Sequence, residues 1–202
     1  MTDNPYKGAG QMTREQFLFY ETRIVASLEL QGLSREEILE KIKEENLFQF
    51  PTERMTSSIT KTCFKRLDAL ESQTLVYHLA NAPADVARQI NLYAMMKHNR
   101  IVWDFMTGVI AEKYRTQEFE LSKKDLNVFF SELQEQNETV ASWSESTINK
   151  IRQVLTHVLV ECEYLDSFKS ETLNPVSIAP ELEDEIRLIN DTQALPAFNC
   201  FR

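Results

Sequence analysis

The chain contains very few of the residues that interrupt regular structure, with four glycines and six prolines among 202 residues. An all-β protein needs many tight turns, and glycine and proline build most of them. Helix is therefore the expected main structure, arranged as one domain or two small ones at this length. Because 43% of the residues are apolar, the chain can bury a sizeable core and is not expected to be disordered.

Helix-capping signatures divide the chain into successive helices. Ser34 followed by Glu37, and Ser122 followed by Asp125, are typical of capping boxes, and Ser144 is a further helix start. Apolar residues recur at spacings of three and four after each start. The predicted helices span about 13–31, 34–46, 53–70, 122–136 and 144–163, with a short helix after Ser72 and either one long helix or two over 84–115. A loose arm of about a dozen residues precedes them.

These elements predict an all-α fold with two packed helical subdomains, residues 1–117 and residues 118–202. A helix, a break and a second helix occur over 34–70 and recur loosely over 122–163. This order is typical of helix-turn-helix modules, in which the second helix enters the major groove of DNA. The second subdomain is a candidate winged-helix relative, with residues 166–178 as a small wing.

The charge is distributed unevenly along the chain. The formal net charge of −9 argues on its own against a nonspecific polyanion binder. Residues 54–115 nevertheless carry more Lys and Arg than Asp and Glu, whereas the segments on either side carry fewer. The stretches Arg54–Leu67 and Ser146–Val160 contain no acidic residue at all. Basic helices are therefore expected inside an acidic protein.

Both acid-free stretches have a polar face that suits nucleic acid. At about 100° per residue, polar side chains of the first stretch gather opposite its apolar stripe. The first candidate set is Arg54, Ser57, Ser58, Lys61 and Lys65, together with Arg66. The second stretch presents Ser146, Asn149, Lys150, Gln153, Thr156 and His157, with Arg152 beside them. Such side chains can reach phosphates and base edges, although an ordinary solvated helix face has the same pattern.

Other kinds of site have little support in the sequence. Cys63, Cys162 and Cys200 are odd in number and far apart, which fits reduced thiols in a cytosol. No Gly-rich phosphate loop and no metal-ligand spacing occur. No signal peptide and no apolar run of membrane-spanning length is present either. We therefore expect a cytoplasmic protein, not an enzyme, with no metal, no cofactor and no membrane partner.

Three short motifs stand out in the chain: Glu21–Ala26, Glu44–Gln49 with Arg66-Leu67 downstream, and Val140–Thr147 with Lys150. Together they resemble the BrxA family of bacterial BREX phage-defence systems. The resemblance extends over residues 15–182, and its most specific part is the Trp-Ser-Glu-Ser-Thr segment before a basic amphipathic helix. The helix that follows Glu44-Glu45-Asn46-Leu47 departs from the family, because Thr52–Thr62 is mostly hydroxylated where relatives are more basic.

The resemblance implies a small, all-helical, non-enzymatic protein that binds double-stranded DNA. Such a protein would work with other BREX proteins, a methyltransferase among them, in marking host DNA and restricting phage. The motifs carry over as candidate DNA-binding residues Ser144, Ser146, Thr147, Lys150 and Arg66. The family has also been likened in fold to the NusB antitermination proteins, which makes RNA an alternative ligand.

A second class of function stays open. The net charge of −9 and the twelve phenylalanines are compatible with a scaffold that contacts other defence proteins and no nucleic acid. Salt-sensitive binding to duplex DNA would favour the first hypothesis, and a protein complex that survives high salt would favour the second.

Overall fold

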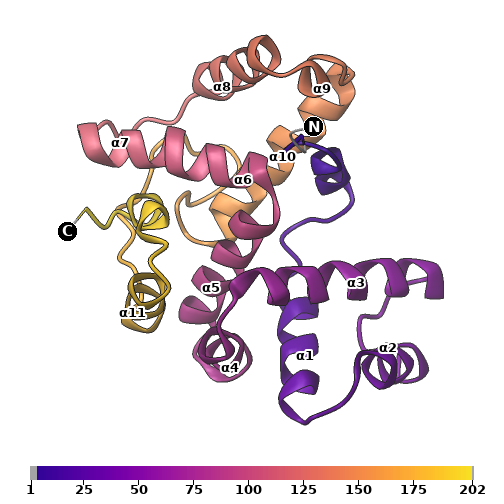
Figure 1. Cartoon of the computed structure of the whole chain (residues 1–202). Helices are drawn as coiled ribbons and strands as arrows, with labels where there is room; N and C mark the ends of the chain where they lie inside the picture. The colour runs from indigo at the N-terminus through magenta and orange to yellow at the C-terminus, as the bar shows by residue number, and fades with distance from the viewer. Residues whose placement is uncertain (1–3, 202) are drawn as a thin grey trace. The chain divides into compact units, whose positions relative to one another are not determined.

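The computed structural model describes residues 4–201, and its fold is all-α (Figure 1). In this range the sole strand-like pairing is an isolated antiparallel bridge between Glu120 and Thr172. The chain divides into two compact units, and each is described by itself. The short unit spans Leu18–His98, and the composite unit joins residues 4–17 to residues 99–201. This division differs from the predicted subdomains 1–117 and 118–202, because residues 4–17 pack with the later part of the chain and residues 99–117 do the same.

The short unit consists of five helices around one apolar core. They are α1 (Phe19–Leu30), α2 (Arg35–Glu44), α3 (Glu53–Leu70), α4 (Gln73–Asn81) and α5 (Ala84–His98). Helix α3 crosses α1 and also packs against α5, and α4 packs against the same two helices. Buried side chains at helical spacing, such as Val25, Ile38, Leu70 and Ile90, form the core between them.

Side-chain caps begin three of these helices where the sequence predicts a start. Ser34 and Glu37 form a complete capping box at α2. The Thr52 hydroxyl accepts a hydrogen bond from the Met55 amide at α3, and the Ser72 hydroxyl accepts one from the Leu75 amide at α4. Each cap satisfies an amide that would otherwise lack a partner, which confirms these predicted helix starts.

The predicted start of the first helix at residue 13 is wrong. The Thr13 hydroxyl donates to the Gly10 carbonyl and does not cap a helix, and Thr13 ends a short 3-10 helix, η1 (Ala9–Thr13). Helix α1 begins only at Phe19, because Leu18 adopts the left-handed conformation with a φ of 52°. A left-handed residue interrupts a right-handed helix, so the capping-like Thr13 and Gln16 lie outside α1.

Residues 84–115 form separate helices, as one of the two alternatives predicted. Helix α5 ends at His98, and the Asn99 side chain caps the next helix by accepting a hydrogen bond from the Ile101 amide at 3.0 Å. From there α6 (Arg100–Asp104), the π-helical segment η2 (Phe105–Ile110) and α7 (Ala111–Thr116) follow without a break. The junction between α5 and α6 is also the junction between the two units.

The composite unit adds α8 (Lys123–Gln136), α9 (Glu138–Ala141), α10 (Glu145–Glu161), α11 (Pro180–Leu188) and the 3-10 segment η3 (Thr192–Phe198). The expected loose arm at the N-terminus is wrong for residues 4–13. Ala9 and Met12 of η1 are buried, η1 packs against α10, and Asn4 donates a hydrogen bond to Thr139. Apolar burial holds this segment in place despite its two glycines.

The predicted wing at 166–178 and the NusB-like fold stay predictions. Residues 166–178 contain bends, turns and irregular backbone, and only Thr172 pairs in a bridge. The Leu121 amide donates to the Glu171 carbonyl, and the Leu173 amide donates to the Phe119 carbonyl, each at 2.7 Å. These bonds attach the segment to the linker before α8.

Candidate nucleic-acid interface

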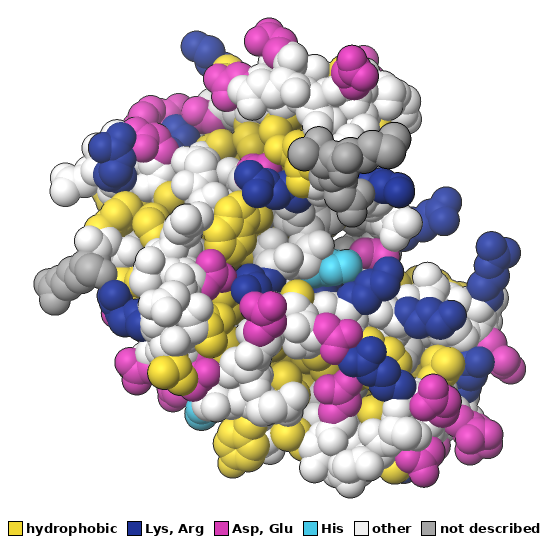
Figure 2. Space-filling view, viewed as in Figure 1, with side chains coloured by type: hydrophobic (Ala, Val, Ile, Leu, Met, Phe, Trp, Pro, Cys, Tyr) yellow, Lys and Arg dark blue, Asp and Glu magenta, His cyan; other side chains and the backbone are white. Residues whose placement is uncertain are grey.

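The exposed side of α3 carries three cations and a hydroxyl. Arg54, Ser58, Lys61 and Lys65 are exposed, and we call them the α3 face. Ile59, Cys63 and Leu67 lie buried on the opposite side of the same helix. Because residues four apart share a side of a helix, Lys61 and Lys65 present their ammonium groups in the same direction. In Figure 2, Lys and Arg side chains gather over α3, with Asp and Glu side chains at their border.

The three cations of the α3 face form no ion pair with any residue from 4 to 201. Other cations of the short unit are paired: Arg35 with Asp68, Lys41 with Glu45 at 3.0 Å, and Lys97 with Glu71 at 3.0 Å. Asp68 is the first acidic residue after the acid-free stretch, and Arg35 of α2 neutralises it. The positive charge of the α3 face is therefore available to an external anion.

Arg66 is wrong as a candidate phosphate contact. Its side chain is 1% exposed and is among the largest fully buried side chains of the protein. Arg66 follows Ile59 by seven residues and Cys63 by three, so the helical period turns it toward the core. Its role is in the core of the short unit and not at the surface.

Most hydroxyls of α3 bond to their own helix. Ser57 donates to the Glu53 carbonyl at 2.8 Å, Thr60 to the Thr56 carbonyl at 2.8 Å, and Thr62 to the Ser58 carbonyl at 3.3 Å. Thr56, Thr60 and Thr62 are also buried. Ser58 is the exposed hydroxyl of the predicted set, and Ser57 is half-buried, so the cations are the main features of the α3 face.

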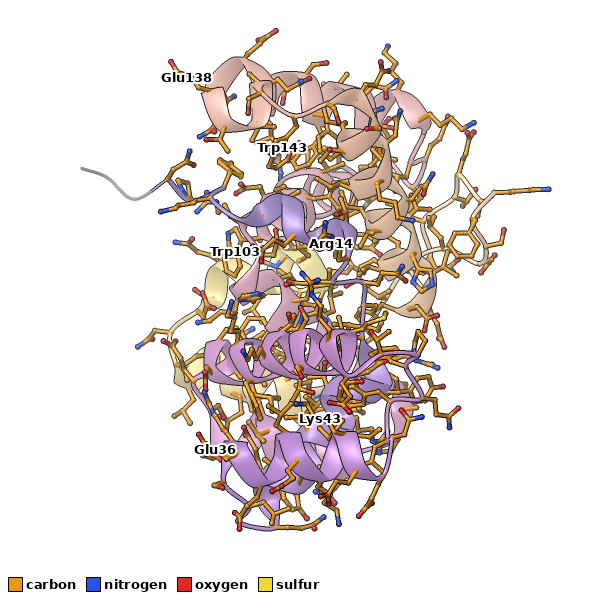
Figure 3. The ribbon with its side chains drawn as sticks, turned by 90° about the vertical axis from the view of Figure 1, so that its right-hand side faces the viewer. Arg14, Glu36, Lys43, Trp103, Glu138 and Trp143 are labelled. Carbon is orange, nitrogen blue, oxygen red and sulfur yellow. The ribbon has the colours of Figure 1, made fainter. Side chains whose placement is uncertain are left out.

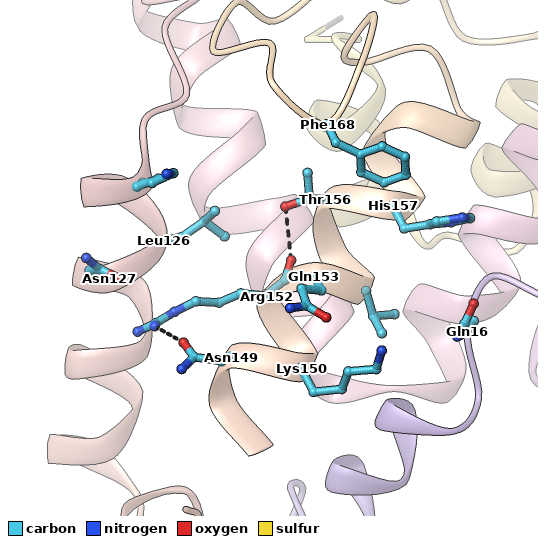
Figure 4. A pocket seen from close by; sticks show the side chains of 12 residues that line it. Gln16, Leu126, Asn127, Asn149, Lys150, Arg152, Gln153, Thr156, His157 and Phe168 are labelled. Carbon is cyan, nitrogen blue, oxygen red and sulfur yellow. Dashed lines mark hydrogen bonds between the residues drawn. The ribbon is translucent and has the colours of Figure 1, made fainter. Parts of the chain in front are cut away.

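The second candidate surface is a hollow of about 720 Å³ in the composite unit, which we call the α8–α10 groove (Figure 4). Its lining comes from α8, α10, the segment after α10 and Gln16. The lining residues are Gln16, Lys123, Leu126, Asn127, Asn149, Lys150, Arg152, Gln153, Val154, Thr156, His157 and Phe168. The set includes two lysines and an arginine but neither Asp nor Glu, so the groove suits an anion.

Predicted site residues of α10 lie in this groove. Asn149 and Lys150 are exposed, and Lys150 forms no ion pair with a described residue. Arg152 donates to the Asn149 side-chain oxygen at 2.8 Å, and its guanidinium carbon lies 5.3 Å from the centre of the Phe130 ring of α8. Arg152 is thus held between two helices while it lines the groove.

Ser144, Ser146 and Thr147 have a structural task at the start of α10. The Ser144 hydroxyl accepts from the Thr147 amide at 3.2 Å and lies 2.8 Å from the Ser146 hydroxyl and 3.0 Å from the Thr147 hydroxyl. Trp143, just before the cap, lies against Gly10 of η1 (Figure 3). The specific Trp-Ser-Glu-Ser-Thr motif therefore begins α10 and packs it against η1, while its exposed serines remain accessible.

The groove also contains residues that sequence reasoning did not identify as contacts. Gln16, Lys123, Asn127 and Phe168 come from three segments other than α10. The capping box at Ser122 predicts α8 but says nothing of which side faces α10. Only the tertiary arrangement of α8, α10 and the two segments that carry Gln16 and Phe168 brings these four residues to one place, and no local pattern indicates it.

A neighbouring hollow of about 500 Å³ in the same unit has a different chemistry. Buried Lys113 pairs there with Asp125 at 3.1 Å and with Glu118 at 3.6 Å. Although burial opposes it, hydrogen bonds from Ser122 and Lys113 hold the pKa of Asp125 below its usual value. Burial and a 2.6 Å hydrogen bond to Asp104 raise the pKa of Tyr6 to about 12. Paired charges line this hollow, and it offers no free cation.

The described part of the chain has neither a metal-binding cluster nor a membrane-spanning helix. Within residues 4–201, no three His, Cys, Asp or Glu side chains come together as a metal site would require. None of the helices in that range combines the length and the apolar character needed to cross a membrane.

The described residues thus define a small all-α protein with two helical units, each of which exposes unpaired cations. A family model described as BrxA matches residues 5–189. The chain therefore belongs to the BrxA family.

Curated relatives agree with this assignment. The BREX protein BrxA of Bacillus cereus (strain H3081.97) is 35% identical over 152 residues, 75% of this chain and 76% of the relative. The BREX protein BrxA of Paramagnetospirillum magneticum is 25% identical over 85% of each chain, and that of Escherichia coli O9:H4 is 24% identical over 91% of this chain and 85% of the relative. The predicted membership is confirmed.

A solved structure shares the fold. The crystal structure of an uncharacterized protein from Magnetospirillum magneticum matches with a TM-score of 0.80 and 23% identity, over 96% of this chain and 98% of that chain. This likeness supports the all-α architecture.

Proposed function

We propose that the chain is a non-enzymatic DNA-binding component of BREX phage defence that acts with other BREX proteins. Membership of the BrxA family supports the place in phage defence and the partnership with other BREX proteins. The α3 face and the α8–α10 groove support the contact with DNA. Lys and Arg on these surfaces would neutralise phosphates and release counterions from the duplex.

One observation carries the DNA part of the proposal. Arg54, Lys61, Lys65 and Lys150 are exposed and form no ion pair with a described residue, although the chain has nine more acidic than basic side chains. An exposed ion pair stabilises a protein by only about 0–1 kcal/mol, so leaving these four cations unpaired costs the fold little stability. These cations stay unpaired although the chain has more carboxylates than cations. This arrangement favours an external anion as their partner.

The order of helices supports a duplex as that anion. Each cationic helix follows a shorter helix and a break, as α3 follows α2 and α10 follows α9. Modules with this order place the second helix in the major groove. Contacts to phosphates position a protein on DNA without selecting a sequence, so binding is expected to tolerate many sequences.

The test is salt-dependent binding to a duplex, measured by fluorescence anisotropy between about 50 and 200 mM salt. The double reversal Lys61→Glu/Lys65→Glu is expected to weaken binding and to reduce the slope of log affinity against log salt by about two, one for each lost phosphate contact. Lys41→Glu is the matched control, since Lys41 lies in the same unit and pairs with Glu45. Its slope should stay unchanged.

Two outcomes would contradict the proposal. Absence of binding at about 50 mM salt with micromolar protein would exclude a functional duplex contact. Equal slopes for the double reversal and for Lys41→Glu would show that the α3 face does not contact phosphates. A double-stranded RNA of the same length belongs in the same experiment, and tighter binding to it would replace DNA with RNA as the ligand.

A scaffold function is the second candidate, and one surface favours it. Tyr20 of α1 is 68% exposed and lines a hollow of about 330 Å³ with Arg23, Ile24, Ser27 and Leu28. An aromatic side chain beside a small apolar hollow is typical of an anchor for a protein partner. A complex with another BREX protein that survives high salt, together with no DNA binding, would favour this function.

A further inference from the structure

The α8–α10 groove is concave, and this shape is more than a phosphate contact requires. An exposed cation on a flat or convex surface is enough to bind a phosphate. Its volume of about 720 Å³ lies within the range of sites that enclose small molecules. In Figure 4, Leu126 and Asn127 of α8 lie on one side, and Lys150 and Gln16 lie on the other. A concave site of this size can hold a ring system as well as an anion.

An aromatic side chain is exposed at one end of this cationic groove. Phe168 is 61% exposed, and its ring centre lies 5.5 Å from that of His157 at an angle of 42° (Figure 4). The exposed Phe168 ring is surrounded by Lys, Arg and amide groups. A flat apolar partner that stacks on it would remove its apolar surface from water, which is favourable. A nucleobase is such a partner, and stacking on an aromatic side chain works for every base.

The polar side chains of the groove match the rest of a nucleotide. Asn127, Asn149 and Gln153 each carry an amide donor and an amide acceptor, which suit the edge of a base. Lys123 and Lys150 supply positive charge for a phosphate.

We propose that the α8–α10 groove accepts one nucleoside 5′-phosphate whose base is unpaired, with the base on Phe168 and the phosphate at one of the two lysines, Lys123 of α8 or Lys150 of α10. Its source within DNA is an extrahelical nucleotide, and this form rests on the DNA binding proposed above. A base inside a paired duplex has both faces covered by its neighbours and cannot stack on Phe168. The protein would thus prefer DNA that contains an unpaired nucleotide.

The experiment compares three duplexes of equal length by fluorescence anisotropy: fully paired, with one extrahelical deoxyadenosine, and with an extrahelical abasic site. The abasic duplex keeps the bend and the phosphate charge but lacks the base. Unmodified protein is expected to bind the deoxyadenosine duplex at least about tenfold more tightly than the abasic one. Phe168→Ala should remove this difference and leave affinity for the paired duplex unchanged. Phe201→Ala, an exposed phenylalanine outside the groove, should preserve the difference.

A second arm uses 2′-deoxyadenosine 5′-monophosphate and detects its base protons by saturation-transfer NMR. Contact that disappears in Phe168→Ala but not in Phe201→Ala supports the groove as a nucleotide site, even if no duplex binds. In that case the proposed DNA binding fails while the nucleotide site stands. Equal binding of the deoxyadenosine and abasic duplexes, with no contact to the free nucleotide, overturns the inference. A paired duplex that still binds would leave the proposed function in place.

Discussion

The α3 face and the α8–α10 groove carry the same kind of charge but are built differently. The α3 face comes from a single helix, and its three cations extend into solvent without a partner from residues 4–201. The groove combines α8, α10, Gln16 and Phe168, and one of its cations, Arg152, is held by Asn149 and by the Phe130 ring. A single-helix surface can exchange one phosphate for another, whereas a surface built from several segments can enclose a particular group.

This difference in construction determines how selective each surface can be for the shape of its ligand. Lysine is a flexible point charge, and three side chains on one convex helix impose few geometric demands on a polyanion. An arginine fixed between two helices, next to amides and an exposed ring, imposes several. We therefore expect the α3 face to determine affinity and its salt dependence, and the groove to determine preference among nucleic-acid structures.

The largest expected effect separates a buried cation from its exposed neighbour. Arg66→Ala should lower the free energy of unfolding by about 3 kcal/mol, because it removes a large, fully buried charged side chain from the core of the short unit. Lys65→Ala, one residue earlier on the exposed side, should change it by less than about 0.5 kcal/mol. Urea denaturation monitored by circular dichroism measures both. A small effect of Arg66→Ala would contradict its assignment to the core.

A smaller effect should distinguish the held cation of the groove from a free one. Arg152→Lys keeps the charge but loses the planar group that bonds Asn149 and lies over Phe130. Affinity for a duplex with one extrahelical deoxyadenosine should fall about fivefold, or about 1 kcal/mol. Lys150→Arg is the matched exchange at an unpaired position, and affinity should change less than about twofold. Fluorescence anisotropy measures both affinities. Similar changes in affinity for the two exchanges would show that Arg152 and Lys150 do not differ in their role.

The smallest expected effect concerns pH and the first turn of α8, which contributes a wall of the groove. The folded pKa of Asp125 is lowered, so its contribution to stability is present above its unfolded pKa of about 4 and is lost as pH falls through the folded value. Stability of the natural chain should therefore exceed that of Asp125→Asn at pH 6, and the excess should shrink toward pH 3. Urea midpoints at the two pH values provide the measurement. An excess that is independent of pH would show that the Ser122 hydrogen bonds and the Lys113 pair together do not stabilise the charged form of Asp125.

Much of the fold could be predicted because helix signals are local. Ser34 and Ser72 cap helices where the sequence places a start, and the capping box at Ser122 opens α8. Thr13 and Gln16 show the limit of such signals. A capping pattern states that a residue can begin a helix, but the left-handed backbone at Leu18 delays α1 until residue 19.

The candidate site was predicted unevenly for the same reason. Periodicity correctly placed Arg54, Lys61 and Lys65 on the surface of α3, and applied to Arg66 it would have placed that residue beside Ile59 and Cys63 in the core. Periodicity says nothing of which helices pack together. It therefore gave no reason to connect Lys123 or Phe168 with α10.

By itself, the sequence determined the helical content, most helix starts and the exposed side of each amphipathic helix, because these depend on residues within a few positions of one another. Only the tertiary structure decided the division into Leu18–His98 and the composite unit, and the gathering of Gln16, Lys123, Lys150 and Phe168 around one hollow. Gln16 lies more than one hundred positions before the other three residues in the sequence. Such arrangements form because apolar faces are buried wherever the whole chain allows it, and no short pattern encodes that choice.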